Sequence, residues 1–287
     1  MIGMRRARLA VLASVLAACA AGTAAAQVAD LVARDALRVC ADPANLPFTN
    51  EAGAGFENKI AELLARDLGV PLQYVWFPQA TGFVRNTLAA KRCDVVMGYA
   101  AGSDPVQNTN PYYRSAWVLV TRRDRGLDGV ESLGDARLKG KRLGVVAGTP
   151  PATLLALHGL IGDAKPYRLT VDRRHESPSE DMVRDIVSGD IDGGILWGPI
   201  GGYFARQAAK GAAKGSAEPL AVMPLTHHEA GVPMTFRITF GIRHGETDWK
   251  HRLNDFIAAR QGEINRLLLD YGVPLIDEQD RPIAASR

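Results

Sequence analysis

The chain alternates short apolar strands with amphipathic helices, and it does so twice. In the first half, strands are expected over residues 37–41, 72–76 and 95–98, with helices over 56–68 and 83–90. Apolar residues spaced by three and four indicate the helices, and short apolar runs bounded by glycine and proline indicate the strands. Strand–helix–strand order predicts a parallel sheet with helices on both faces.

The second half has the same order. Strands are expected over 142–146, 167–169 and 194–197, and helices over 150–158 and 178–188. One of its units resembles a unit of the first half, because each reads helix, short turn, aspartate, buried strand and glycine. Unrelated α/β units can share such a pattern by chance. The recurrence favours two similar lobes over one large sheet.

The aspartates of that recurring unit are Asp94 and Asp192, and the glycines that close it are Gly98 and Gly198. Since the strand of each unit is apolar throughout, it is expected to be covered on both faces. The two aspartates are therefore expected to occupy equivalent positions in the two lobes.

The C-terminal part completes the topology. A strand over 235–242 is followed by helical segments that cannot form a core alone, so they are expected to return to the first lobe. Lobe 1 then comprises residues 27–120 and 240–287, and lobe 2 comprises residues 121–239. The predicted fold is α/β, with two lobes, a central cleft and two crossing hinge strands. Ligands of open α/β sheets bind at the carboxyl ends of the strands, which here face the cleft.

The N-terminus has the pattern of an export signal. Three arginines precede the apolar run Leu9–Ala18, and the small residues at 24–26 predict cleavage before Gln27, so that residues 1–26 form a signal peptide. The alternative is a lipoprotein, because Leu16-Ala17-Ala18-Cys19 matches the motif in which the cysteine is acylated. Either product is exported, and we expect it in the periplasm.

Removal of this segment changes the charge of the chain. The formal net charge of the 287 residues is +3, and residues 1–26 contain three arginines and no acid, so the mature chain is neutral. A neutral chain argues against a nucleic-acid partner. Outside the N-terminus, no apolar run reaches the roughly 20 residues of a membrane-spanning helix.

Two cysteines remain in the mature chain, Cys40 and Cys93. In an oxidising compartment they predict one disulfide, and the alternative is two separate buried thiols. A bridge requires their Cα atoms to lie within about 7 Å of each other. We expect no metal, because the chain has no Cys-x-x-Cys and no cysteine–histidine cluster. His227-His228-Glu229 is assigned to a solvated loop, since adjacent side chains of an extended segment point apart.

Taken in order, the segments resemble the type II periplasmic solute-binding proteins, most nearly their amino-acid-binding branch. The matching residues are Leu37–Asp42 leading to Pro47-Phe48, Gly55-Phe56-Glu57, Asp94-Val95-Val96, Pro111-Tyr112-Tyr113, and Leu138–Lys141 before Gly148-Thr149. The resemblance covers essentially the whole mature chain, and it implies the two-lobed fold.

A narrower resemblance is to the MoxJ/XoxJ group, the solute-binding-like proteins that accompany quinoprotein methanol dehydrogenases. It rests on Cys40–Pro43, Gly55–Ile60, Gly82–Leu88, Arg92–Val96 and Tyr271–Leu275. The resemblance implies a periplasmic accessory protein rather than a nutrient receptor. It would act on a pyrroloquinoline-quinone methanol dehydrogenase of the lanthanide type, and it is not expected to be an enzyme itself. The implied partners are that dehydrogenase and its cytochrome c, and the accessory chain is expected to be a monomer without a cofactor.

Two departures from the amino-acid binders concern the ligand. Those proteins usually place an arginine after the strand equivalent to 95–98 and an acid after the strand equivalent to 194–197. Here the loop 99–105 has no arginine, and the second strand ends in Trp197-Gly198-Pro199. Recognition of a zwitterion needs both charges, so free α-amino acids are not expected to bind.

Two other functions stay open. One is the receptor of an ABC importer for a small solute that is not an amino acid. The other is an enzyme built on this scaffold, which would need a general acid in the cleft, and no acid in the sequence has to enter it.

Five residues are candidates to line the cleft. Phe48, Tyr99, Tyr112 and Trp197 fall at strand ends or in loops, and aromatic walls suit a flat or apolar ligand or a partner segment. Thr149 is placed to cap a helix whose free N–H groups would hold an anion. The alternative for the aromatic residues is core packing, above all for Tyr112. The alternative for Thr149 is a cap that only stabilises its helix.

Overall fold

The computed structural model describes residues 32–210 and 220–283. The signal peptide and the lipoprotein motif fall before residue 32, and those two predictions lie outside the described residues. The strands are β1 (Leu37–Ala41), β2 (Ala44–Asn45), β3 (Thr49–Asn50), β4 (Leu72–Trp76), β5 (Val95–Ala100), β6 (Gln107–Arg122), β7 (Leu143–Val146), β8 (Lys165–Tyr167), β9 (Gly193–Trp197), β10 (Leu220–Pro224) and β11 (Thr235–Ile242). The α-helices are α2 (Phe56–Leu68), α3 (Phe83–Asn86), α4 (Pro150–Leu157), α5 (Pro178–Ser188), α6 (Gly198–Lys210) and α7 (Thr247–Asp270).

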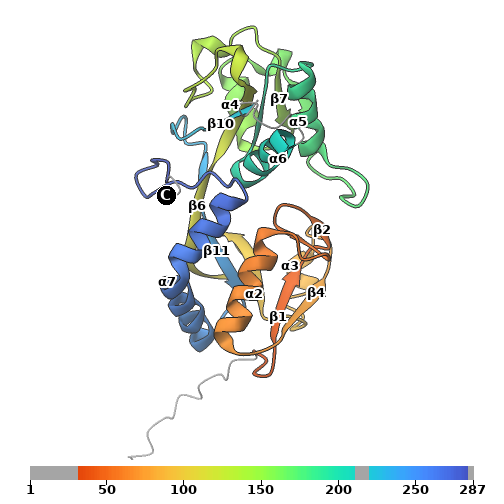
Figure 1. Cartoon of the computed structure of the whole chain (residues 1–287), viewed down its shortest axis with the longest axis vertical. Coiled ribbons are helices and arrows are strands. Elements are labelled where there is room, and N and C mark those ends of the chain that lie inside the picture. Colours follow the sequence, from red (N-terminus) through yellow and green to blue (C-terminus); the bar gives the residue numbers. More distant parts are fainter. Residues whose placement is uncertain (1–31, 211–219, 284–287) are drawn as a thin grey trace, which may run out of the picture.

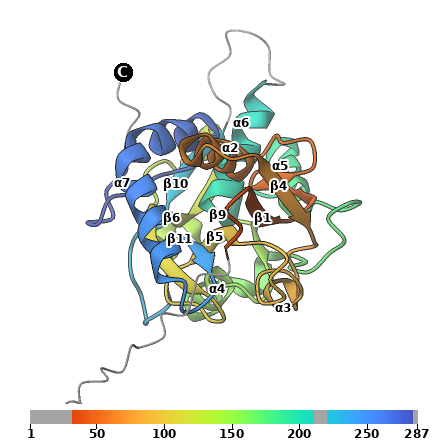
Figure 2. The same ribbon diagram turned by 90° about the horizontal axis from the view of Figure 1, so that it is seen from below.

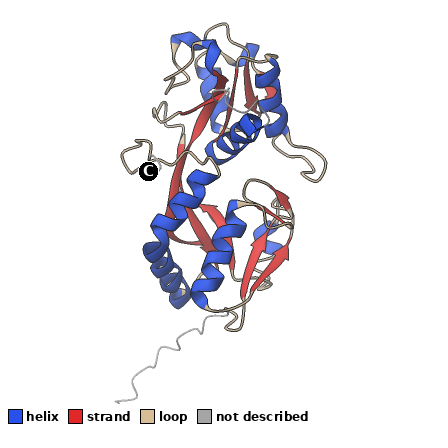
Figure 3. Cartoon of the chain, viewed as in Figure 1, coloured by secondary structure: helices blue, strands red, loops and turns tan. Residues whose placement is uncertain are grey.

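Two lobes are stacked along the long axis of the molecule (Figure 1). The strand order is β4-β1-β5-β11-β6-β9-β7-β8, and β10 pairs with β6. The first three strands are parallel, as are the last three, and β11 and β6 run antiparallel between the two groups. Helices flank the strands of each lobe (Figures 2 and 3). This is the predicted α/β class with two lobes, but the strands form one continuous nine-stranded sheet where separate sheets were expected, because β6 passes from one lobe to the other.

The long strand β6 belongs to both lobes. From Gln107 to Ala116 it pairs with β11, and from Trp117 onward it pairs with β9 and β10. The carbonyl of Met234, just before β11, accepts a hydrogen bond from the N–H of Trp117 at 2.8 Å. The chain therefore returns to lobe 1 beside the point where β6 leaves it. The residue limits of the lobes, 27–120 with 240–287 and 121–239, stay a prediction.

Each lobe has its own apolar core. In lobe 2, the upper lobe in Figure 1, alternate residues of β6 and β9 face opposite sides of the sheet. Leu119 and Ile195 pack in one cluster, and Val118 and Leu196 pack in the other. Both sheet faces are therefore buried, which explains why these strands are apolar throughout.

The recurring aspartates occupy equivalent places in the two lobes. The backbone N–H of Asp94 donates to the carbonyl of Arg38 at 2.8 Å, and the N–H of Asp192 donates to the carbonyl of Arg142 at 2.8 Å. In both lobes the aspartate lies just before a central strand and bonds to the start of its neighbour. The shared contact supports the duplication that the sequence suggested.

Several elements differ from the prediction. Helix α3 ends at Asn86 rather than at residue 90, because the backbone of Thr87 leaves the helical region and its hydroxyl donates to the carbonyl of Phe83 at 2.7 Å. Strand β8 covers 165–167 rather than 167–169. The tail forms one continuous helix, α7, where the sequence indicated helical segments.

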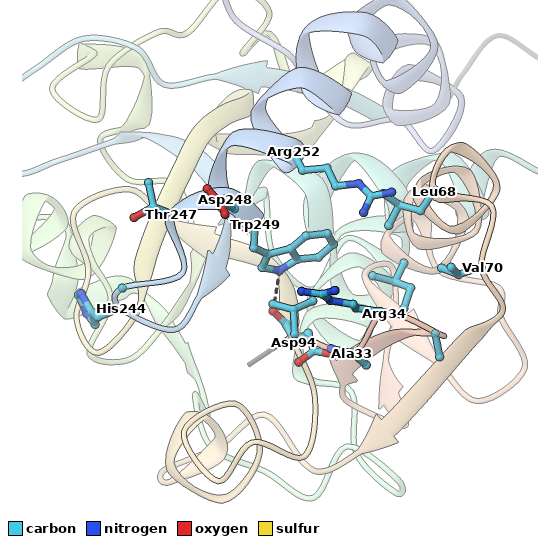
Figure 4. Close-up of a pocket in the computed structure, with 14 residues that line it drawn as sticks. Ala33, Arg34, Leu68, Val70, Asp94, His244, Thr247, Asp248, Trp249 and Arg252 are labelled. Atoms are coloured by element: carbon cyan, nitrogen blue, oxygen red, sulfur yellow. Dashed lines mark hydrogen bonds between the residues drawn. The ribbon is translucent and has the colours of Figure 1, made fainter. Parts of the chain in front are cut away.

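The carboxylate of Asp94 joins three distant segments of lobe 1. It is fully buried and accepts two hydrogen bonds from Arg38 of β1, at 2.7 Å each, and one from Arg243 at 2.7 Å. Arg243 lies between β11 and α7 and also pairs with Glu246 at 2.6 Å. Trp249, at the start of α7, donates its indole N–H to the Asp94 carbonyl at 3.0 Å (Figure 4).

A disulfide lies beside this network. Cys40 of β1 and Cys93, which precedes Asp94, are bridged, with their Cα atoms 5.5 Å apart. The predicted disulfide is therefore confirmed, and the alternative of two free thiols is set aside. The covalent bond and the ion pairs fix the same corner of lobe 1.

Replacing Asp94 by asparagine should destabilise the protein by about 3 kcal/mol or more, because removing one partner of a buried ion pair leaves the other charge without compensation. The side chain of Arg243 is only 10% exposed. Urea unfolding of the mature chain measures this loss. The control is Asp67→Asn, whose carboxylate pairs with Arg260 at the surface and should cost about 0–1 kcal/mol. Equal losses in the two variants would contradict this account.

Candidate functional site

A cavity of about 650 Å³ lies between the lobes. Lobe 1 contributes the connection after β1, and lobe 2 contributes the ends of β7 and β9, the segment between β8 and α5, and helix α6. The principal lining residues are Pro43, Asn45, Asn50, Trp117, Val146, Thr149, Arg168, Leu169, Val171, Arg173, Glu176, Trp197, Ile200, Tyr203 and Phe204. The cavity thus lies at the carboxyl ends of the parallel strands β1 and β7, where the topology predicts a ligand site. We call it the cleft.

Four aromatic side chains form part of the lobe 2 side of the cleft, and we call them the aromatic wall. Trp117 and Trp197, paired across β6 and β9, contact each other edge to face with ring centres 6.0 Å apart. Trp197 also contacts Phe236, at 5.6 Å, and Tyr203 and Phe204 extend the wall along α6. The indole nitrogen of Trp117 is buried and has no hydrogen-bond partner among the described residues. The four rings present apolar surface, and the charged lining residues Arg168, Arg173, Glu176 and Glu180 lie on the segment between β8 and α5 and at the start of α5.

Helix α6 holds two of these aromatic residues, and no helix was expected at this position. It begins Gly198-Pro199-Ile200-Gly201-Gly202, a composition typical of a loop. The reason for glycine is a close approach, because a Cβ on Gly202 would lie 1.9 Å from the carbonyl oxygen of Gly272. Next to this contact, Tyr203 stacks on Tyr271 with ring centres 6.3 Å apart. Helix α6 therefore rests directly on the turn after α7.

Of the five predicted cleft residues, Trp197 and Thr149 line the cavity. Thr149 does not cap α4 with its side chain, however, since its hydroxyl donates to the carbonyl of Val146 at 2.6 Å. The first two helical residues, Pro150 and Pro151, have no N–H, and the N–H of Ala152 bonds to the carbonyl of Thr149 at 3.0 Å. The suggested anion site at this helix terminus therefore lacks the donors that it needs.

Tyr112 belongs to the core and not to the cleft. Its side chain is 1% exposed, its hydroxyl donates to the carbonyl of Met97 at 2.8 Å, and its ring stacks on Phe240 at 4.6 Å. The cleft assignment of Tyr112 is wrong because β11 and α7 cover it, and only the complete fold brings them there.

Tyr99 and Phe48 lie on lobe 1 but do not line the cavity. The Tyr99 hydroxyl donates to the carbonyl of Asp104 at 3.2 Å within the loop after β5. Phe48 is half-buried, packs on the lobe 1 core and contacts Phe56 edge to face at 5.2 Å. The lobe 1 side of the cleft is formed instead by the short segment from Pro43 to Leu46.

An ion pair crosses the cleft. Arg173, in the segment between β8 and α5, places its Nη1 at 3.1 Å from Oδ2 of Asp42, which directly follows β1. Asp42 is 4% exposed and accepts further hydrogen bonds from the N–H groups of Ala44, at 2.8 Å, and Gln79, at 2.7 Å. From the sequence, neither residue was assigned to the cleft, although Asp42 stands at the carboxyl end of a strand, where ligand sites of such folds lie.

The loop with His227, His228 and Glu229 is held by side-chain contacts rather than freely solvated. Glu229 pairs with His158 and accepts a hydrogen bond from Ser132, and His228 pairs with Asp280 at 3.0 Å. These contacts join the loop to the rest of lobe 2 and to the C-terminal tail. Within residues 32–210 and 220–283, no three His, Cys, Asp or Glu side chains are grouped so as to hold a metal ion.

Glu57, at the start of α2, is a buried acid at the carboxyl end of β5. Its carboxyl lies against Gly98, where a Cβ would come within 2.1 Å of Oε1. Burial raises the pKa of Glu57 from about 4.5 to about 8. It does not line the cavity, so its carboxyl is not presented to a molecule in the cleft.

Comparison with known sequences identifies the family. The model of the bacterial extracellular solute-binding proteins, family 3, matches residues 37–273. The chain belongs to this family. It is 30% identical to Protein MoxJ of Methylorubrum extorquens over 246 residues, which cover 84% of this chain and 81% of that protein. Its match to Protein MoxJ of Paracoccus denitrificans is 43% identical over 114 residues, or 39% of this chain, and spans less than half (41%) of that relative.

Solved structures give the same result. The periplasmic binding protein XoxJ from Methylobacterium extorquens AM1 is 41% identical, with a TM-score of 0.69 over 84% of this chain and 100% of that one. MxaJ from Methlophaga aminisulfidivorans MPT is 25% identical, with a TM-score of 0.71 over the same shares. The type II periplasmic binding fold and the resemblance to the MoxJ/XoxJ group are thereby confirmed. Membership in this extracellular family implies the periplasm, and none of the described helices has the length and apolarity needed to cross a membrane.

Calorimetry with the standard amino acids should show no binding tighter than millimolar. The guanidinium groups that line the cleft are already paired, Arg173 with Asp42 and Arg168 with Glu176. A zwitterion would therefore lose hydration that the cleft does not replace. Micromolar binding of any standard amino acid to the mature chain would contradict this prediction.

Glu57→Gln should stabilise the protein increasingly as the pH rises from 5 to 8. The folded-state pKa of Glu57 is raised, so folding favours its neutral form, and this contribution is complete below pH 4.5 and is lost as the pH rises through 8. Glutamine stays neutral, so the difference in unfolding free energy between variant and wild type should grow up to about pH 8 and then level off. Urea unfolding at pH 5, 7 and 9 measures it. Glu62→Gln is the control, because Glu62 is only partly buried and its carboxylate pairs with Lys59. The same pH trend in both variants would refute the assignment.

Proposed function

We propose that this protein is a periplasmic accessory protein that binds a quinoprotein methanol dehydrogenase through the cleft and supports its activation or maturation. The similarity to MoxJ and XoxJ supports the choice of partner, and the lanthanide-type dehydrogenase and its cytochrome c are the partners that the resemblance implies. The role is one of binding rather than catalysis.

The observation that carries the proposal is the aromatic wall of the cleft. The guanidinium groups of the cleft are paired with carboxylates of the protein, and β6, β9 and α6 present Trp117, Trp197, Tyr203 and Phe204. Large aromatic side chains are the usual anchors of protein–protein contacts, because they bury much apolar area at a small cost in side-chain entropy. The cleft is therefore suited to a protruding apolar segment of a partner.

The charge balance supports the same interpretation. The mature chain is neutral, so long-range electrostatic steering of a partner is modest, and affinity depends on buried contacts. The aromatic residues on the lobe 2 side of the cleft can make such contacts.

A second candidate function is the receptor of an ABC importer for a small neutral solute. The cleft volume, about 650 Å³, falls in the range of small-molecule sites, and the family consists of solute-binding proteins. The neighbouring genes separate the two functions. A dehydrogenase and a cytochrome c beside the gene favour the accessory role, and a permease with an ATPase favours the receptor.

Trp197→Ala should weaken binding to the cognate dehydrogenase at least tenfold, since truncating a buried aromatic anchor costs about 2 kcal/mol or more. Biolayer interferometry with purified dehydrogenase measures the affinity. The activity and quinone content of the dehydrogenase are compared with and without this protein. Leu157→Ala is the control, because Leu157 is a 59% exposed apolar residue outside the cleft lining.

Each variant must melt as the wild type does before its affinity is compared. If wild type neither binds the dehydrogenase nor changes its activity or quinone content, the accessory role is refuted. If Trp197→Ala binds as tightly as wild type, the partner contacts another surface, and the site assignment fails alone.

A further inference from the structure

A loop of lobe 2 forms one side of the cleft. Residues 168–177 connect β8 to α5, and in Figure 1 this green loop beside α5 extends down toward β2 of lobe 1. Arg168, Leu169, Val171 and Arg173 of this loop line the cavity. We call residues 168–177 the cleft loop. A molecule that enters the cleft from this side has to pass it.

We infer that the cleft loop is a latch, closed by the ion pair of Arg173 with Asp42, and that the latch must open before a partner segment can enter the cleft. The inference rests on the proposed function only for the identity of the partner. The latch itself is a property of the isolated chain, and it can be tested there.

The receiving side of the latch is rigid. Asp42 is 4% exposed, and the N–H groups of Ala44 and Gln79 hold both of its carboxylate oxygens. These two residues come from different segments of lobe 1, so the carboxylate has one fixed orientation. The remaining direction at Oδ2 points to the guanidinium of Arg173, 3.1 Å away.

The donating side is shaped by the loop itself. Asp172 pairs with Arg174 at 2.6 Å, and its carbonyl accepts the N–H groups of His175 and Glu176 at 3.0 Å each. These contacts form a turn within the cleft loop, and Arg173 lies inside that turn. Arg174 therefore pairs within the loop, whereas Arg173 reaches Asp42 of lobe 1.

The strength of the ion pair suits a latch. The side chain of Arg173 is 41% exposed, and partly exposed ion pairs contribute little to stability because water and salt screen them. Such a contact favours the closed arrangement without making it permanent.

Another contact between the lobes, one of several that join α6 and lobe 2 to the C-terminal part, is of a different kind. At Gly202 and Gly272 the two backbones touch, and the rings of Tyr203 and Tyr271 stack beside them. A side-chain rotation cannot release a backbone contact, whereas it can release Arg173 from Asp42. The cleft is therefore expected to open at the cleft loop.

The test measures the distance between the lobes in the isolated mature protein with its disulfide intact. Spin labels are placed at Gln73 on β4 and Val187 on α5, both exposed, and the distances are measured by pulsed EPR. Arg173→Gln should give longer and broader distances than wild type, and Arg173→Lys, which keeps the charge, should remain close to wild type. Arg260→Gln is the matched control, because its surface ion pair with Asp67 lies within lobe 1. In 1 M salt the wild-type distances should approach those of Arg173→Gln. At this ionic strength the Debye length is about 3 Å, so salt weakens the ion pair.

The second measurement concerns access to the cleft. If the latch must open first, Arg173→Gln should associate with the dehydrogenase up to about fivefold faster than wild type, as expected from the loss of one partly exposed ion pair. Unchanged distances in Arg173→Gln would overturn the latch, whether or not the dehydrogenase binds. Longer distances with an unchanged association rate would overturn the gating of entry. Absence of dehydrogenase binding in every variant would overturn the proposed function and leave the distance test of the latch standing.

Discussion

The buried carboxylate of Asp94 is the contact on which lobe 1 depends. This lobe is assembled from both ends of the chain, and its halves meet where Arg38 and Arg243 converge on Asp94. The two arginines are about two hundred positions apart, so ordering their contacts has a large entropic cost that burial and charge pairing must offset. The Cys40–Cys93 bridge reduces that cost, because it already fixes Asp94 beside β1.

The second lobe repeats this arrangement in a looser form. Asp192 makes the same backbone contact as Asp94, and its carboxylate accepts the N–H of Arg142 at 2.9 Å. Its ion pair, with Arg125, is longer, at 3.7 Å, and more exposed. Lobe 2 does not have to bring together the two ends of the chain, so the entropic cost that its ion pairs must offset is smaller.

Charge and apolar surface have separate places in the cleft. Its arginines pair within the protein, one of them across the lobes, while the aromatic wall remains available. In a binding protein for zwitterions, the charged groups would be kept for the ligand. Here they pair with carboxylates of the protein, Arg168 within the cleft loop and Arg173 across the lobes, and this difference links the missing amino-acid clamp, the proposed protein partner and the proposed latch.

Local sequence determined the elements, and the tertiary structure decided the site. The bounds of β1, α2, β4 and α5 could be predicted because their hydrophobic spacing and terminal glycine or proline residues act over a few positions. The disulfide followed from the number of cysteines in an exported chain. Helix α6 could not be predicted, since its glycines serve a contact with Gly272 rather than a local preference.

The same limit explains the cleft residues. Tyr112 and Trp197 are both aromatic residues on strands, and only the packing of β11 and α7 decides that one is buried and the other lines the cleft. Arg173 and Asp42 are 131 positions apart and meet only because the two lobes face each other. Hydrophobic periodicity reports which face of an element is buried, whereas contacts between lobes depend on how the elements are placed relative to one another in space.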